Sequence, residues 1–132
     1  MIYLDSSALI KLVRPERETL ALERFLKANS KRPHVASELV ITEVLRSLIR
    51  HQAPTEQFET AHELLGQLVL LPVNRWVLEH AAAVPDQFLR SLDAIHVASA
   101  QRLRSALLAL VTYDERMVVA AASAKVPSES PM

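Results

Sequence analysis

Short apolar runs of β-prone residues, separated by helical patterns, constrain the fold of this chain more than any other feature of its sequence. The first run is Ile2-Tyr3-Leu4, and it stops at Asp5. Further runs occupy His34 to Ala36, Leu68 to Leu71 and Leu107 to Val111. Continuous apolar runs of this length are typical of strands buried on both faces of a parallel sheet. Because strands that alternate with helices form parallel sheets with right-handed crossovers, the sequence predicts an α/β fold.

The spacing of apolar residues and the positions of capping residues predict the helices between these runs. Ser6 or Ser7 is expected to cap the first helix, and Ser37, Asn74, Ser91 and Asp114 are expected to cap later ones. The predicted helices span about residues 8–13, 15–28, 38–50, 55–68, 75–84, 92–104 and 115–124. We expect one domain, residues 1–126, followed by a flexible tail at residues 127–132, which hold two prolines and two serines.

The composition excludes several classes of functional site. A single glycine cannot supply the glycine-rich phosphate loops of nucleotide-binding proteins. The absence of cysteine excludes disulfides, iron–sulfur clusters and thiolate zinc sites, and it fits a reducing cytoplasm. Every apolar run is too short to cross a membrane. The 15 basic residues balance the 15 acidic ones, so any contact with nucleic acid must come from a local basic rim.

Four carboxylates are predicted to meet at one edge of the sheet. Asp5 and Asp114 each follow a short aliphatic strand, Asp93 lies in the first turn of a helix, and Glu43 lies on the helix after the second strand. In a parallel sheet the strand ends and the following helix N-termini share one rim, where ligands bind. Clustered carboxylates need a counter-charge, and their oxygen atoms suit Mg²⁺ or Mn²⁺. This pattern predicts metal-assisted phosphodiester hydrolysis.

Each of these residues also has a purely structural interpretation. Asp5 and Asp114 can be helix N-caps, and Asp93 can be a first-turn charge that the helix dipole favours. Glu43 can point outward and pair with a neighbouring arginine on the same helix, Arg46 or Arg50. Independent caps have no reason to fall at one end of one sheet, so the joint placement favours a functional site.

Four segments resemble the PIN-domain ribonucleases and, more narrowly, the VapC toxins of bacterial toxin–antitoxin pairs. They are Ile2 to Leu9, Ser37 to Glu43, Leu92 to Ala98 and Val111 to Arg116, and they occur in the order of the family. The resemblance implies a three-layer α/β/α fold around a central, mainly parallel sheet of four or five short strands. It also implies a cytoplasmic endoribonuclease that depends on Mg²⁺ or Mn²⁺, forms a homodimer and is neutralised by a VapB-type antitoxin.

The resemblance assigns roles to the four acids. Asp5 and Asp93 match the main metal ligands of the family, and Glu43 and Asp114 match its other two acidic positions. All four are therefore expected to be catalytic, with Asp5, Asp93 and Asp114 as the metal ligands.

Five further residues are expected near this site. Ser6 and Thr112 match small hydroxyl residues that line the site in the family. His96 lies one turn after Asp93, where it is either a hydrogen-bonding member of the acidic cluster or a satisfied core histidine. Arg90 and Arg116 flank the acidic motifs and are expected to contact RNA phosphates.

Two departures from the family pattern concern the surroundings of the site. Relatives commonly have a glycine shortly before the Leu-Asp-Ala motif, where this chain has Pro85-Asp86-Gln87, and they often continue into another strand, where this chain reaches Pro127. An alternative function is a catalytically inactive PIN-type module whose acidic cleft binds a basic partner. A haloacid dehalogenase-type enzyme would need a second Asp two residues after Asp5, where Ser7 stands.

Overall fold

Five parallel strands form one sheet at the centre of the molecule. The computed structural model describes all 132 residues. The strands are β1 (Ile2–Leu4), β2 (His34–Ser37), β3 (Val69–Leu71), β4 (Ala109–Val111) and β5 (Ser128–Glu129). Their order across the sheet is β3-β2-β1-β4-β5, and every neighbouring pair is parallel. The predicted parallel α/β fold with a central sheet of short strands is confirmed.

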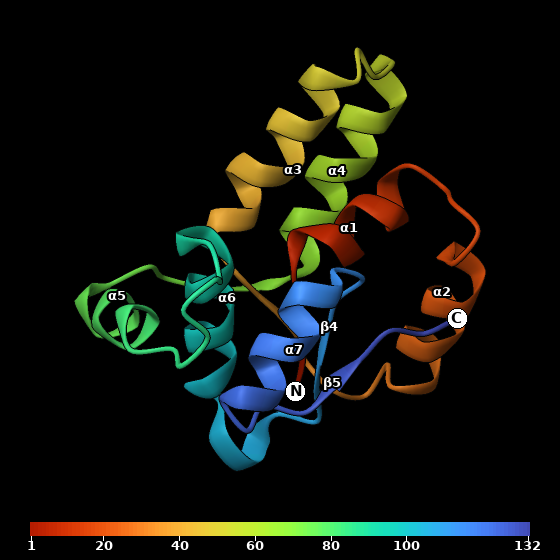
Figure 1. The fold of residues 1–132 in the computed structure, drawn as a ribbon. Helices are drawn as coiled ribbons and strands as arrows, with labels where there is room; N and C mark the ends of the chain where they lie inside the picture. The colour runs from red at the N-terminus through yellow and green to blue at the C-terminus, as the bar shows by residue number, and fades with distance from the viewer.

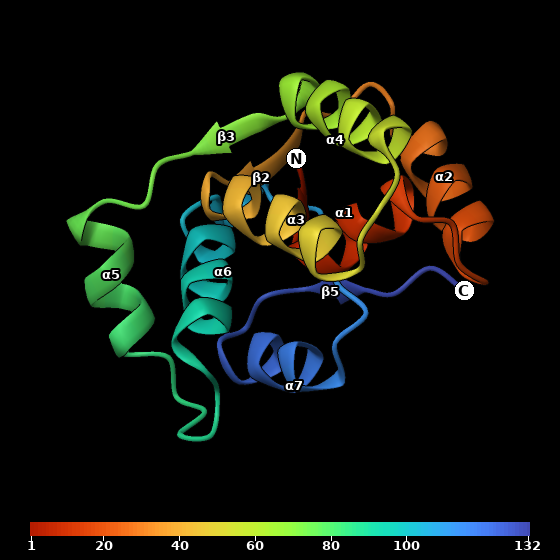
Figure 2. The ribbon, with the colours of Figure 1, turned by 90° about the horizontal axis from the view of Figure 1, so that it is seen from above.

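Helices cover both faces of this sheet (Figures 1 and 2). Their bounds are α1 Ser6–Val13, α2 Thr19–Ala28, α3 Leu39–Arg50, α4 Thr55–Gln67, α5 Arg75–Ala82, α6 Ser91–Gln101 and α7 Glu115–Ser123, with a 3₁₀ turn at Arg104–Ala106. On one face of the sheet, helices α1, α2, α3 and α4 form a hydrophobic core with the side chains of Ile2 and Leu4. On the other face, helices α6 and α7 form a second core with Tyr3 and Leu110. Because side chains alternate along a strand, β1 feeds both cores and is the centre of the three-layer fold.

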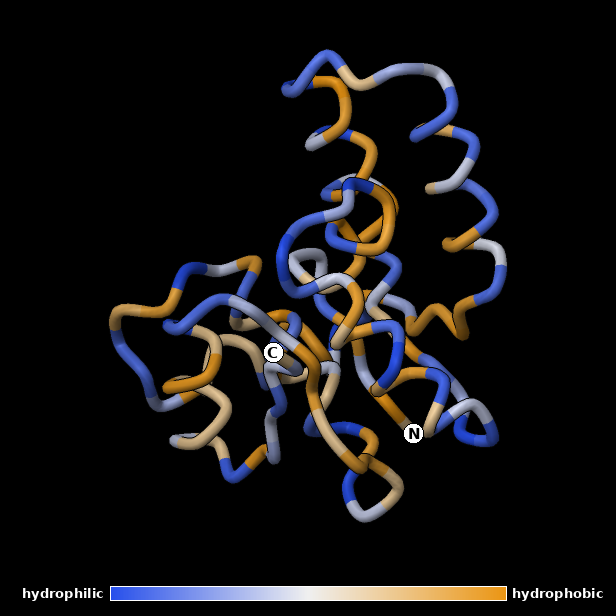
Figure 3. Tube along the Cα trace, turned by 90° about the vertical axis from the view of Figure 1, so that its right-hand side faces the viewer, coloured by the Kyte–Doolittle hydropathy of each residue, from blue (hydrophilic) through white to orange (hydrophobic).

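Helix α5 lies outside these two layers. It packs only on α6, through a small cluster of Val77 and Ala81 against Ala94 and Ala98. In Figure 1 it stands apart from the rest of the molecule on the far side of α6. The α3–α4 hairpin projects at the top of the molecule in Figure 1, and its turn is mainly hydrophilic in Figure 3. None of the helices combines the length and the apolar character needed to cross a membrane.

The helix N-termini correct part of the predicted capping. Asp5 itself caps α1, because its Oδ1 accepts a hydrogen bond from the Ala8 N–H at 3.0 Å, so Ser6 and Ser7 already belong to the helix. Asn74 and Asp114 cap α5 and α7 as predicted. Helix α6 begins at Ser91 rather than after it, and no side chain caps it.

Two residues of the expected tail, 128–129, form strand β5 at the side of β4. The Leu110 N–H donates to the Pro127 carbonyl at 2.8 Å, and the Thr112 N–H donates to the Glu129 carbonyl at 3.1 Å. The Ser130 hydroxyl donates to the Thr112 carbonyl at 2.6 Å. Without β5, the donors along this side of β4 would have no partner in the sheet, and an unpaired buried donor is costly. Pairing with β4 therefore overrides the loop-like composition of the tail.

Candidate active site

The carboxyl ends of β1 and β4 lie side by side at the centre of the sheet. Leu4 is in register with Val111, and the Asp5 N–H donates to the Val111 carbonyl at 3.3 Å. Asp5 therefore leaves β1 next to the segment that leads from β4 to Asp114. This is the strand-end rim at which ligands bind in open α/β sheets.

Asp5 is a buried carboxylate with both oxygens engaged. Its side chain accepts from the Ser7 hydroxyl at 2.6 Å and from the Ala8 N–H at 3.0 Å through Oδ1, and from the Thr112 hydroxyl at 2.5 Å through Oδ2. Burial raises the pKa of Asp5, and the hydrogen bonds from Ser7 and Thr112 only partly oppose this rise. The carboxylate is thus held in one orientation while its negative charge is poorly solvated.

Ser7, rather than Ser6, provides the serine hydroxyl of the site. The Ser7 Oγ donates to Asp5 and accepts from the Tyr113 N–H at 2.9 Å, and the Thr112 Oγ1 accepts from the Asp114 N–H at 3.2 Å. These two hydroxyls tie the loop after β4 to the first turn of α1. Ser6 forms no side-chain hydrogen bond. The signal that would have identified Ser7 is the position of Asp5 as N-cap, which places the hydroxyl of the second following residue beside the capping carboxylate.

The negative charges of the other three predicted acids all act on the pKa of Asp93. It is half-buried in the first turn of α6. Burial raises its pKa, and the negative charge of Asp114 raises it further, with smaller contributions from Glu43 and Asp5. No group in the protein donates a hydrogen bond to its carboxylate. The structure thus brings the four predicted acids to one end of the sheet, where they repel one another.

Asp114 caps α7 and keeps one oxygen free. Its Oδ1 accepts from the Arg116 N–H at 2.9 Å, and its Oδ2 has no hydrogen-bond partner in the chain. The structural and functional interpretations of this residue are therefore compatible, because the capping bond uses only one side of the carboxylate.

Glu43 points into the site, and the outward alternative with Arg46 or Arg50 is wrong. Its Oε1 lies 2.6 Å from the Nε2 of His96, which is only 1% exposed. The Nδ1 of His96 lies 2.8 Å from the hydroxyl of Tyr3. Burial alone would lower the pKa of His96, but the hydrogen bond and charge of Glu43, with the nearby aspartates, outweigh it and raise that pKa. His96 is thus both a core histidine and a partner of the acidic cluster.

The two arginines flank this rim with their side chains exposed. Arg90 immediately precedes α6, and Arg116 lies in the first turn of α7. Neither forms a salt bridge within the chain, so both guanidinium groups are free to bind an external anion.

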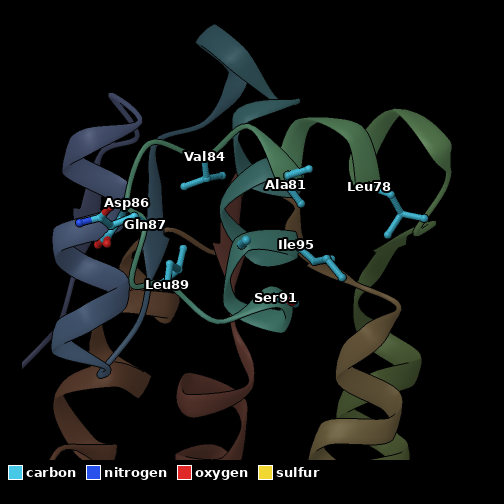
Figure 4. Close-up of a pocket in the computed structure, with 10 residues that line it drawn as sticks. Leu78, Ala81, Val84, Asp86, Gln87, Leu89, Ser91 and Ile95 are labelled. Carbon is cyan, nitrogen blue, oxygen red and sulfur yellow. The ribbon is translucent and has the colours of Figure 1, made fainter.

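A cavity lined mainly by apolar side chains lies next to α6, the helix that carries Asp93. It has a volume of about 350 Å³ between α5, α6 and the loop that joins them. Figure 4 shows Leu78, Ala81, Val84, Leu89 and Ile95 around it. The loop residues Asp86 and Gln87, where the chain departs from the family pattern, also line it. This cavity contains none of the four clustered acids.

The chemistry of the acidic rim fits a hard divalent cation. No group of three or more Asp, Glu or His side chains is gathered closely enough to form a complete cage of protein ligands. Mg²⁺ does not need such a cage, because it usually keeps several waters and binds through one or two carboxylates. Asp93 and the free oxygen of Asp114 are the donors with unused capacity, and a cation between them would relieve the repulsion that raises the pKa of Asp93.

Comparison with known proteins agrees with this arrangement. The family model described as PIN domain matches residues 2–123. The chain is 43% identical over 116 residues to Ribonuclease VapC46 of Mycobacterium tuberculosis, with 88% of this chain and 86% of that protein covered. Among solved structures it is similar to the sarcin–ricin loop cleaving toxin VapC20 of M. tuberculosis, with a TM-score of 0.76 at 17% identity over 99% of this chain and 100% of that one. It is also similar to a chain of a toxin–antitoxin complex from Klebsiella pneumoniae, with a TM-score of 0.73 at 20% identity over 100% of this chain and 98% of that one.

Proposed function

The chain belongs to the PIN-domain family, among its VapC-type ribonucleases, and on this basis we propose that it is a metal-dependent endoribonuclease that hydrolyses RNA phosphodiester bonds. The observation that carries the proposal is the placement of Asp5 and Asp114 after the adjacent strands β1 and β4, at the end of the sheet where Asp93 and Glu43 also lie half-buried. A cluster of carboxylates that share a rim without a counter-charge is suited to a divalent cation and to a phosphate bound through it.

We assign the metal, Mg²⁺ or Mn²⁺, to Asp5, Asp93 and Asp114. When bound, such an ion polarises a phosphodiester and lowers the pKa of a coordinated water. Asp5 is fixed by hydrogen bonds from the Ser7 and Thr112 hydroxyls, and this fixes the orientation of the first ligand. Asp93 and Asp114 approach from two different helices and complete the negative site.

Glu43, Arg90 and Arg116 act on the substrate side in this proposal. Glu43 faces the cluster with one oxygen free, where it can accept a proton from an attacking water. The exposed guanidinium groups of Arg90 and Arg116 bind backbone phosphates on either side of the scissile bond. Because the chain carries no net charge, these local cations rather than a global field would hold the RNA.

The proposed partner is a VapB-type antitoxin that neutralises the enzyme. The acidic rim can receive a basic side chain from such a partner, and an arginine there would compete with the metal. A cytoplasmic location and a homodimer are proposed from the family resemblance.

Cleavage of RNA by the purified protein tests the proposal. We expect cleavage in Mg²⁺ or Mn²⁺, its loss on addition of a chelator, and a fall of at least about 100-fold in Asp5→Asn and Asp93→Asn. Asp86→Asn is the matched control, because Asp86 lies in the loop after α5 outside the acidic cluster and should keep wild-type activity. Cleavage by Asp5→Asn at the wild-type rate would refute the assignment of the site.

A binding module without turnover is the second candidate function. The observation in its favour is that the acids do not form a complete ligand cage. It predicts that wild-type protein binds a basic partner through the cleft but cleaves no RNA in any divalent metal. Chelator-sensitive cleavage by wild-type protein would exclude it.

A further inference from the structure

A chain of buried hydrogen bonds lies beneath the acidic rim, and it joins the strands and helices that carry the acids. We propose that Tyr3 and His96 are positioning residues that fix the carboxylate of Glu43 toward the cluster. The inference rests on the proposed function, because it concerns how one acid of that site is held. Neither side chain is expected to touch RNA, since Tyr3 is fully buried and His96 is 1% exposed.

The contacts run in series from the backbone of β2 to the carboxylate. The Ser37 N–H donates to the Tyr3 hydroxyl oxygen at 3.2 Å. That hydroxyl lies 2.8 Å from His96 Nδ1, and His96 Nε2 lies 2.6 Å from Glu43 Oε1. The series therefore links β2, β1, α6 and α3, which are separated by up to 93 positions along the chain.

The donors and acceptors in this series fit only one arrangement when the imidazole is neutral. An ionised carboxylate can only accept hydrogen bonds, so Nε2 of His96 must carry a proton and donate the hydrogen bond to Glu43. Nδ1 is then an acceptor, and the Tyr3 hydroxyl donates to it while its oxygen accepts from Ser37. The Tyr3 hydroxyl and both ring nitrogens of His96 then have partners, as buried polar groups require.

This arrangement leaves Glu43 half engaged. Its Oε1 is held by His96, whereas Oε2 has no hydrogen-bond partner in the chain. Glutamate is a long, flexible side chain whose immobilisation costs conformational entropy, so an isolated Glu43 would sample orientations away from the cluster. A fixed imidazole selects the inward orientation. His96 lies one helical turn after Asp93 and on the same side of α6, so the group that orients Glu43 moves with a proposed metal ligand.

Substitution of His96 tests the positioning role directly. His96→Leu removes both ring nitrogens, and we expect kcat for RNA to fall by about 10- to 100-fold with little change in KM, as for other groups that orient an active-site ligand. Tyr3→Phe removes only the donor to Nδ1 and should have a smaller effect in the same direction. His96→Gln offers an N–H donor near the position of Nε2 and should recover part of the loss. The control is His34→Leu, because His34 lies at the amino end of β2, opposite the strand ends that carry the acids, and its Nε2 has no partner.

Coupling to Glu43 separates a positioning role from a general loss of structure. In a Glu43→Gln background, His96→Leu should change kcat by less than about threefold, because the group it orients is already altered. Equal effects of His96→Leu in the wild-type and Glu43→Gln backgrounds would overturn the inference. The thermal midpoint of each variant, read by circular dichroism, identifies any variant that fails to fold, in which case Tyr3→Phe carries the test.

Two measurements need no catalysis. Nitrogen-15 spectra of the imidazole, recorded at a pH above the raised pKa of His96, should show its proton on Nε2, and Tyr3→Phe should change the Nδ1 shift. Calorimetric titration with Mn²⁺ should show weaker binding to His96→Leu than to His34→Leu, because a Glu43 side chain turned away from the cluster no longer adds its negative charge near the metal ligand Asp93. If wild-type protein does not cleave RNA but these two results hold, the proposed function fails and the positioning of Glu43 stands. If wild-type protein cleaves RNA and His96→Leu matches it in kcat and Mn²⁺ affinity, the positioning role fails and the proposed function stands.

Discussion

Thr112→Val tests whether a single buried hydroxyl holds the acidic rim together. Thr112 is fully buried, and its hydroxyl donates to Asp5 Oδ2 at 2.5 Å while accepting from the Asp114 N–H at 3.2 Å. Valine keeps the branched shape of threonine and replaces the hydroxyl with a methyl group. The substitution therefore removes two hydrogen bonds with little change in packing.

The expected loss of stability follows from those two bonds. A hydrogen bond to a charged group contributes about 1.5–3 kcal/mol, and an unpaired buried donor costs about 1–3 kcal/mol. Asp114 is only half-buried, so water can replace much of its lost partner, and the added methyl group returns about 0.8 kcal/mol of hydrophobic stabilisation. We expect a net loss of about 2–3 kcal/mol. For a domain of this size, such a loss of unfolding free energy corresponds to a fall in Tm of roughly 6–15 °C.

Urea denaturation with a matched threonine variant measures this loss. The control is Thr60→Val, whose exposed hydroxyl only donates to the Glu56 carbonyl within α4 and should change the unfolding free energy by less than about 0.5 kcal/mol. RNA cleavage by Thr112→Val should fall as well, because Asp5 loses a donor that stabilises its charged form. A Thr112→Val protein as stable and as active as Thr60→Val would refute the reasoning.

Three further predictions concern charge, core and sheet edge. Because burial and Asp114 raise the pKa of Asp93, its ionised form destabilises the folded state once the pH exceeds the ordinary aspartate pKa. Asp93→Asn should therefore raise the unfolding free energy at pH 7 in chelator by no more than about 1 kcal/mol, because solvent screens the exposed half of the side chain, and thermal melts should show the gain vanish at acidic pH, where both states are protonated. Leu22→Ala should cost about 2–5 kcal/mol in urea denaturation, whereas the exposed Leu20→Ala should cost less than about 0.5 kcal/mol. Truncation after Val126 removes β5 and should cost about 1–3 kcal/mol by the same measurement, and an unchanged midpoint would mean that β5 adds nothing to stability.

Much of the fold was predictable because local and tertiary signals agree along most of this chain. Strands β1 and β4 are short aliphatic runs that end close to acids, and Asn74 and Asp114 cap helices where their sequence context predicts. The alternation of strands and helices predicted the parallel sheet, and the family resemblance added the three-layer arrangement. The motif order also placed four acids at one rim before any side-chain contact was known.

The features that sequence reasoning missed depend on tertiary contacts. Ser7 can be distinguished from Ser6 only once Asp5 is identified as the N-cap of α1, and its contact with the loop after β4 depends on the tertiary structure. Strand β5 has a loop-like composition and forms because β4 offers it a partner. The contact between Tyr3 and His96 joins residues 93 positions apart, and no spacing rule in one sequence can identify it.

The structural and functional interpretations of the acids turn out to describe one arrangement rather than two alternatives. Asp5 has both oxygens engaged by protein donors, Asp114 has one engaged through its helix cap, and Asp93 has none. Capping bonds and hydroxyl donors therefore fix the first two carboxylates before any ligand arrives. Asp93, held only by its helix and repelled by its neighbours, has the most to gain from a cation. Metal binding should accordingly change the environment of Asp93 more than that of Asp5, and carboxyl carbon shifts on titration with Mg²⁺ can measure the difference. A larger shift at Asp5 would mean that its hydrogen bonds break on metal binding, which contradicts the fixed role assigned to it here.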